Sequence, residues 1–129
     1  MKKFYIIIVV IIIIMFGYMV LNNLFKQSKL IEVDGKLIKD EVSFGDIKFG
    51  ETIVTVVDGK TLITVVIKNF GKDSFHTNEI IFKLIDSNKK VIASSSKEDV
   101  FITANSERLY NVSFDKIYKN IYDIEYVIK

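Results

Sequence analysis

The feature that most constrains this chain is an uncharged apolar segment near its start. From Phe4 to Leu21 no residue carries a charge, and Ile6 to Ile14 is an unbroken run of Ile and Val. A helix of this length would extend about 27 Å, close to the hydrocarbon thickness of a bilayer. A helix also satisfies its own backbone hydrogen bonds in lipid. We therefore predict one transmembrane helix within residues 1–21.

A removable signal peptide is the alternative interpretation of this segment. Signal peptides have a charged start and an apolar middle of about 7–15 residues, followed by an Ala-x-Ala-like cleavage site. Here the apolar segment is longer, and the first alanine of the chain is Ala93. The chain has no cysteine, so neither a lipid-modified cysteine nor a disulfide is available. We expect an uncleaved signal anchor.

The charges on the two sides of the anchor point in opposite directions. Lys2 and Lys3 favour a cytoplasmic N-terminus, whereas four lysines between residues 26 and 39 favour the reverse. The segment that follows the anchor is a whole domain, and long domains are translocated largely regardless of their charge. We therefore expect a single-pass protein of the cell membrane with its C-terminal domain outside the cytoplasm.

The domain that follows the anchor is electrically balanced. Lys2 and Lys3 account for the net charge of +2, so the remaining 16 basic residues match 16 acidic ones. Proteins that bind nucleic acid concentrate positive charge on one face to neutralise phosphates. The balanced composition therefore argues against a nucleic-acid partner.

The chain after the anchor divides into two segments. Residues 22–42 are predicted to be a stalk or a small hairpin, because Asp34-Gly35 lies between two apolar pairs. Residues 43–129 contain dense strand signals and are predicted to form one domain. Within it, Asp58-Gly59 joins two β-branched runs, which indicates a hairpin with a type I′ turn.

Short β-strands are predicted throughout residues 43–129. Alternating apolar residues should place three sets of side chains on buried faces: Ile63, Val65 and Ile67; Ile80, Phe82 and Leu84; Tyr110, Val112 and Phe114. The polar segments 69–74, 86–90 and 94–99 are predicted to be loops. The tail fits a helical stripe as well, but its Ile and Tyr content favours a strand over residues 122–128. About seven short strands predict an all-β, antiparallel sandwich.

Several of these stretches resemble the FxLYD-type domain of bacterial and archaeal surface proteins. Residues 82–86 read F-K-L-I-D, with Ile85 where the family usually has tyrosine. Residues 65–69 (V-V-I-K-N) resemble the family's V-x-V-x-N strand end, and residues 106–114 resemble its turn and F-x-V-x-F strand. The resemblance covers 43–129. It implies an immunoglobulin-like β-sandwich, usually extracytoplasmic, and brings no shared catalytic residues.

Two positions depart from the family pattern. Lys89 stands where the family often has glycine, and Ala104-Asn105 replaces a Pro-Gly. A left-handed backbone would cost lysine about 1–2 kcal/mol, so we expect the turn at Lys89 to be of another type. Asn105 tolerates a left-handed backbone better and is expected to substitute for glycine.

The sequence contains no recognisable catalytic motif. His76 is the single histidine, and no G-x-S-x-G stretch or phosphate-binding loop is present. We predict no catalytic residue, no cofactor and no metal site, and therefore a protein that is not an enzyme. Partner binding is predicted in the segments 69–78 and 94–99, and within the first through Phe70, Phe75 and His76, because loops present side chains without disturbing a core.

The predicted function is that of a membrane-tethered, extracytoplasmic binding module. Its partners would be the membrane, through the N-terminal helix, and another protein or envelope component. The alternative is a structural accessory subunit of a larger membrane or cell-envelope complex. The anchor contains one small residue, Gly17, and so lacks a G-x-x-x-G packing face, which favours a plain tether.

Overall fold

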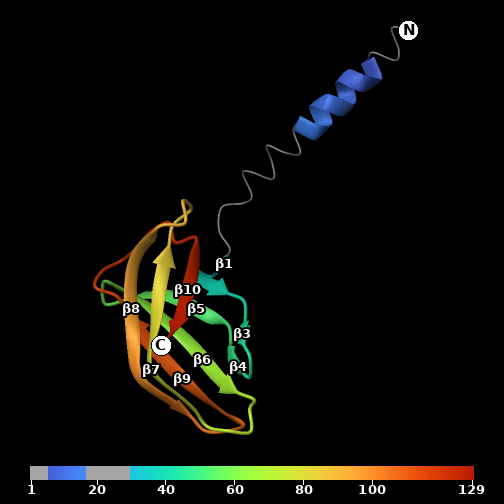
Figure 1. Ribbon diagram of the computed structural model, residues 1–129. Helices are drawn as coiled ribbons and strands as arrows, with labels where there is room; N and C mark the ends of the chain where they lie inside the picture. Colours follow the sequence, from blue (N-terminus) through green and yellow to red (C-terminus); the bar gives the residue numbers. More distant parts are fainter. Residues whose placement is uncertain (1–5, 17–29) are drawn as a thin grey trace.

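The computed structural model describes residues 6–16 and 30–129 (Figure 1). Residues 6–16 form an α-helix of Ile, Val, Met and Phe, and all of its side chains are exposed. The predicted membrane segment continues beyond both ends of this helix, into residues outside the described ranges. Within those ranges, no helix is both long enough and apolar enough to cross a bilayer.

Residues 30–129 form an all-β domain whose strand pairs are all antiparallel. Its ten strands are β1 (Ile31–Val33), β2 (Lys36–Lys39), β3 (Val42–Phe44), β4 (Ile47–Phe49), β5 (Thr52–Val57), β6 (Lys60–Asn69), β7 (Phe75–Ile85), β8 (Val91–Ile102), β9 (Ser106–Ser113) and β10 (Asp123–Ile128). The predicted all-β, antiparallel class is confirmed. The strand alternative for the tail is also confirmed, as β10.

The larger sheet is built around β6. One edge of β6 pairs with β9, and the other pairs first with β5 and then with β4. The ladder is interrupted at Gly50, whose N–H donates to the carbonyl oxygen of Val66 at 2.8 Å. The sheet continues outward from β5 to β2 and β1, and from β4 to β3. The segment predicted as a stalk or hairpin thus contributes a hairpin, β1–β2, to the sheet.

The smaller sheet has the order β10-β7-β8. The chain stays in the larger sheet through β6 and then passes between the two sheets after β6, β8 and β9 (Figure 1). This arrangement forces the two sheets to share one core, because each connection brings a new apolar strand face against the opposite sheet.

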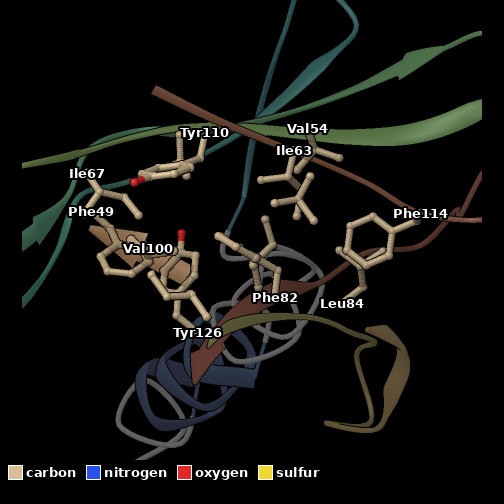
Figure 2. Packing of buried hydrophobic residues seen from close by; sticks show 14 of the residues in the cluster. Phe49, Val54, Ile63, Ile67, Phe82, Leu84, Val100, Tyr110, Phe114 and Tyr126 are labelled. Atoms are coloured by element: carbon tan, nitrogen blue, oxygen red, sulfur yellow. The ribbon is translucent and has the colours of Figure 1, made fainter. Parts of the chain in front are cut away.

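The core lies between the two sheets, with side chains from both pointing toward each other (Figure 2). The three predicted sets of alternating apolar residues are all buried, which confirms their facing. The other buried core members come from the remaining strands and from loops: Leu30, Ile47, Phe49, Val54, Val100, Ile102, Ile121, Ile124 and Tyr126.

Tyr126 of β10 connects the two sheets. Its ring centroid lies 4.5 Å from that of Phe49 in the larger sheet and 5.6 Å from that of Phe82 in its own sheet. Its hydroxyl forms a hydrogen bond of 2.5 Å with the hydroxyl of Thr52, which is fully buried. A tyrosine can be buried at this position because its polar end has this partner.

Two Asp-Gly turns join the strands of the β1–β2 and β5–β6 hairpins of the larger sheet. Asp58 and Gly59 have φ angles of 51° and 73°, and Asp34 and Gly35 have φ angles of 51° and 77°. Positive φ at both central residues defines the type I′ turn, so the prediction for Asp58-Gly59 is confirmed.

The predicted loop 94–99 is wrong throughout, and the loop predicted within 69–78 is wrong in part. Residues 94–99 belong to β8, and residues 75–78 belong to β7, so the loop after β6 covers 70–74 alone. The reason is the pairing of β7 with β8, which the backbone makes without regard to side-chain polarity. Because β8 is an edge strand with a solvent-facing side, its polar stretch resembled a loop in the sequence.

The expected turn type at Lys89 is also wrong. Lys89 has a φ of 63°, so it adopts the left-handed backbone that the family's glycine would occupy. The carboxylate of Asp86 accepts hydrogen bonds from the N–H groups of Asn88 and Lys90, at 2.9 and 3.0 Å, and these bonds hold the turn. Asn105 has a φ of 55°, which confirms its role as a glycine substitute.

The strain at Lys89 generates a prediction. Lys89→Gly removes the left-handed penalty and should stabilise the domain by about 1 kcal/mol, measured by thermal or denaturant unfolding. Lys90→Gly is the matched control, because Lys90 has no positive φ and should lose stability through added backbone entropy. Equal effects of the two substitutions would contradict the explanation.

The burial of Phe82 in the core leads to a second prediction. Phe82→Ala empties a fully buried site between the sheets and should reduce the free energy of unfolding by about 3–5 kcal/mol. Leu109→Ala is the control on the outer face of β9, where the side chain is 60% exposed and its removal should have little effect. A Phe82→Ala variant as stable as the parent would contradict the packing described here.

Candidate functional site

One end of the sandwich is organised by the buried side chain of Asn69, the last residue of β6. Its amide nitrogen donates to the carbonyl oxygens of Asp73, at 2.8 Å, and of Ile102, at 3.1 Å. Its amide oxygen accepts from the N–H of Gly71 at 2.9 Å. Asn69 is 2% exposed, so these bonds replace the water that its amide loses on burial. One side chain thus fixes the 70–74 loop to the end of β8.

The turn between β3 and β4 forms the other wall of this end. The N–H of Phe70 donates to the carbonyl oxygen of Asp46 at 2.9 Å. A Cβ on Gly71 would lie 3.0 Å from the side-chain oxygen of Asn69 and 3.1 Å from that of Asp46. Gly71 is therefore the residue that lets the loop approach both side chains.

Two open hollows flank Asn69. The larger, of about 320 Å³, is lined by residues that include Phe44, Asp46, Lys72 and Phe75. Their mixed charges give this hollow no single-sign field.

The smaller hollow has a volume of about 190 Å³. It is lined by residues that include Lys68, Phe70, Asn105 and Glu107. The β8–β9 turn supplies Asn105, so this hollow joins the loop end to the edge of β9. Both hollows are concave surfaces on which a partner's side chain could rest.

The structure separates the three predicted partner-binding residues. Phe70 is 61% exposed and lines the smaller hollow, whereas Phe75 lines the larger one and packs partly against the core. His76 lies on β7 and points away from the core, outside both hollows. Phe70 and Phe75 therefore share one end of the molecule, and His76 belongs to a neighbouring strand face.

His76 has a carboxylate partner. Its Nε2 lies 2.8 Å from Oδ1 of Asp99 on β8, and its ring lies 6.3 Å from that of Phe101, its cross-strand neighbour. The His76 side chain is 50% exposed. In the described part of the chain no serine, threonine or tyrosine hydroxyl is hydrogen-bonded to this ring, and a Ser-His-Asp mechanism requires that contact.

The pKa values of Glu41 and Tyr118 are both shifted further from 7. A hydrogen bond from Lys48 lowers the pKa of Glu41, and a hydrogen bond to Asp115 raises the pKa of the Tyr118 hydroxyl. General acid–base catalysis near pH 7 requires shifts in the opposite directions for these residue types. These two shifts therefore reflect surface contacts and do not mark a reaction centre.

Burial raises the pKa of Tyr126 to about 12, and its hydrogen bond with Thr52 offsets part of this rise. Because the folded-state pKa lies above the ordinary value of about 10, the neutral phenol favours folding below that pH. This contribution is lost as the pH rises from about 10 through 12. Tyr126 is therefore a structural residue at neutral pH.

Residues 6–16 and 30–129 contain no candidate metal-binding site. No group of three or more His, Cys, Asp or Glu side chains in these ranges is placed to hold an ion. Asp86 directs a carboxylate oxygen at backbone N–H groups of its own turn, so that oxygen supports the turn.

The sequence pattern missed the roles of Asn69 and Asp99. Asn69 follows an apolar run and is predicted to be the first residue of a loop, although a buried asparagine at a strand end is a strong hydrogen-bonding group. Asp99 has a φ of 53° and lies 23 positions from His76, so no local signal joins them. Only the β7–β8 register brings these two residues together.

Comparison with known proteins assigns no family. No family model matches the chain, and no curated protein matches it. Among solved structures, it is similar to a DUF1425 family member from a Shewanella species, with 10% sequence identity and a TM-score of 0.48. The match covers 78% of this chain and 94% of the other. A resemblance at this level indicates neither the function nor the partners of this chain.

The role of Asn69 can be tested directly. Asn69→Ala leaves two carbonyl oxygens and one N–H without their partner, and should cost about 2–3 kcal/mol of unfolding free energy. Asn69→Asp keeps the acceptor for Gly71 and loses both donors, so the Gly71 amide should stay protected from hydrogen exchange in this variant and lose protection in Asn69→Ala. Similar exchange of Gly71 in both variants would contradict the assignment.

Proposed function

We propose that this protein is a membrane-tethered binding module whose β-domain lies outside the cytoplasm. The observation that carries the proposal is the helix of residues 6–16, which exposes eleven consecutive large apolar side chains. The β-domain has a core of its own and leaves this helix uncovered. Water is an unfavourable environment for such a surface, whereas the hydrocarbon of a bilayer matches it.

The extension of this helix over residues 4–21 is part of the proposal. It supplies the length that the described helix lacks, since eleven residues rise about 16 Å and a bilayer core needs about 30 Å. The location of the domain outside the cytoplasm is supported by Lys2 and Lys3, which favour a cytoplasmic N-terminus, and by the length of the domain, because long domains are translocated largely regardless of the lysines that follow the anchor.

The finer fold assignment belongs to the same proposal. The order β5-β6-β9 in one sheet and β10-β7-β8 in the other corresponds to strands A-B-E and F-C-C′ of an immunoglobulin-like sandwich. Membership of the FxLYD-type group is supported by the F-K-L-I-D stretch, in which Phe82 and Leu84 point into the core and Asp86 holds the turn. Immunoglobulin-like sandwiches commonly bind through loops and strand edges, which agrees with a binding function.

Binding is favoured over catalysis by the form of the candidate site. The loop end presents concave surfaces with Phe70 and Phe75, on a frame held by Asn69. Such a rigid frame with exposed aromatic side chains is suited to recognising another protein or an envelope component. The tether adds to this, because a membrane-bound domain meets membrane-bound partners at a high effective concentration.

A structural accessory subunit remains the alternative function. It is favoured by the exposed Ile and Val side chains of helix 6–16, which could pack against other membrane helices as well as against lipid. Replacing residues 4–21 with an unrelated membrane-spanning sequence separates the two functions. A binding module should keep its activity after this exchange, and an accessory subunit should lose it.

The location and the binding surface can be tested in the native host. Protease added to intact cells, after removal of any wall, should digest the β-domain of the full-length protein.

Photo-crosslinking of the full-length protein to its partner tests the binding surface. Phe70→Ser and Lys72→Glu, both at exposed positions, should each reduce the crosslinking yield if the loop end is the binding surface. His76→Ala and Leu109→Ser are the controls and should leave the yield unchanged. A protected domain, or a folded His76→Ala variant without function, would contradict the proposal.

A further inference from the structure

The strand β10 has one edge without a strand partner in the described part of the chain. β10 pairs with β7 along its whole length, and β7 pairs on its other side with β8. The larger sheet extends further on the side of β10, through β2 and β3. Lys39 of β2 and Phe44 of β3 both reach β10. The smaller sheet thus ends at β10, beside strands that continue beyond it.

The backbone geometry shows which groups of β10 face this open edge. The N–H of Lys129 donates to the carbonyl oxygen of Glu79, at 2.9 Å, so Lys129 directs its N–H toward β7. In an antiparallel ladder, alternate residues direct both backbone groups to the same side. Ile124, Tyr126 and Ile128 therefore direct theirs away from β7. The bond between the carbonyl oxygen of Ile124 and Nζ of Lys39, at 2.5 Å, agrees with this assignment.

Side chains already form hydrogen bonds with the backbone groups of one of these three residues, Ile124. The N–H of Ile124 donates to the carboxylate of Asp123, at 2.8 Å, and the same carboxylate oxygen lies 2.6 Å from Nζ of Lys39. Together, Asp123 and Lys39 replace a neighbouring strand at Ile124. An inward-pointing lysine is a common way of closing a sheet edge. Here it closes one position and leaves Tyr126 and Ile128 with outward backbone groups.

The surface beside the open edge is partly apolar. Phe44 is 39% exposed, although its ring contacts those of Phe49 and Tyr126, at 5.3 and 6.3 Å between centroids. Leu37 of β2 packs against the core and is only partly buried. A strand placed along β10 would direct every second side chain toward these residues and bury them further.

We propose that the edge of β10 at Tyr126 and Ile128 binds an extended strand of a partner protein, added antiparallel to the smaller sheet. Main-chain hydrogen bonds would supply affinity, and side chains would supply selectivity. Glu125 and Lys129 are exposed and lie on the outer face of β10, on either side of Val127. The partner strand therefore carries a basic residue opposite Glu125, an acidic residue opposite Lys129, and apolar residues between them that point inward.

The chain contains a peptide that meets these requirements. Residues 123–129 read D-I-E-Y-V-I-K, and an antiparallel copy centred on Val127 places its lysine opposite Glu125 and its glutamate opposite Lys129. Its tyrosine and second isoleucine then face Ile128 and Tyr126 and exchange hydrogen bonds with them. This heptapeptide, with its ends blocked, is a defined probe for the edge.

The first experiment uses the probe with the full-length protein in detergent micelles. The peptide should bind, and N-methylation of its tyrosine and second isoleucine should weaken binding at least about tenfold, because these amides face β10. N-methylation of its glutamate and valine should leave binding unchanged, because these amides face away. Equal effects of the two methylated peptides, or no binding of the parent peptide, would overturn the proposal.

Variants of the protein give an independent test. Ile128→Pro removes an outward N–H, which an edge strand tolerates, and should weaken peptide binding, whereas Ile128→Val should retain it. Glu125→Lys should weaken binding about tenfold, and a peptide with glutamate in place of its lysine should restore it. Peptide binding should also slow hydrogen exchange of the Tyr126 and Ile128 amides. Failure of the charge-reversed peptide to restore binding would overturn the proposed register.

Sedimentation of the same micelles distinguishes a second copy of this chain as the occupant. The proposal expects a monomer at the concentrations where the peptide binds. A dimer that the peptide dissociates would assign the edge to self-association and overturn the choice of a separate partner. Because none of these readouts depends on the 70–74 loop, the edge can fail while the loop-end function stands, and the reverse also holds.

Discussion

The packing of Tyr126 between Phe49 and Phe82 is the contact on which the arrangement of the two sheets depends. It joins the end of the chain to a strand near the start of the domain, and its hydroxyl is satisfied by the buried Thr52. Because Tyr126 must face inward, the alternation of β10 is fixed along its length. The same constraint decides which backbone groups of β10 bond to β7 and which face the open edge.

Asn69 is the corresponding polar contact, at the point where β6 ends. Its three hydrogen bonds replace strand pairing where β6 ends, and they hold the 70–74 loop against Ile102. The loop end and the edge of β10 are thus two kinds of surface on one frame. The first offers side chains, Phe70 and Phe75, on a fixed loop. The second offers backbone groups, and Lys39 with Asp123 limits how many of them are available.

Both surfaces suit a protein that is held close to its partners. Loop hollows and short strand edges give modest affinity, since each provides a small contact area. The proposed tether to the membrane would compensate for this by raising the effective concentration of membrane-bound partners. The packed core would support the same proposed function, because a preorganised frame loses little entropy when a partner binds.

The sequence by itself determined the apolar N-terminal segment, the all-β class and the inward faces of β6, β7 and β9. These features are local, since strand alternation and Asp-Gly turns are readable from neighbouring residues. Only the tertiary structure decided that residues 94–99 form a strand and that Lys89 takes a left-handed backbone. It alone decided that Asn69 holds a loop, that His76 meets Asp99, and that β10 is an edge strand among the described residues. Apart from the turn at Lys89, which the nearby carboxylate of Asp86 holds, each of these depends on contacts between residues distant in sequence, which no local pattern encodes.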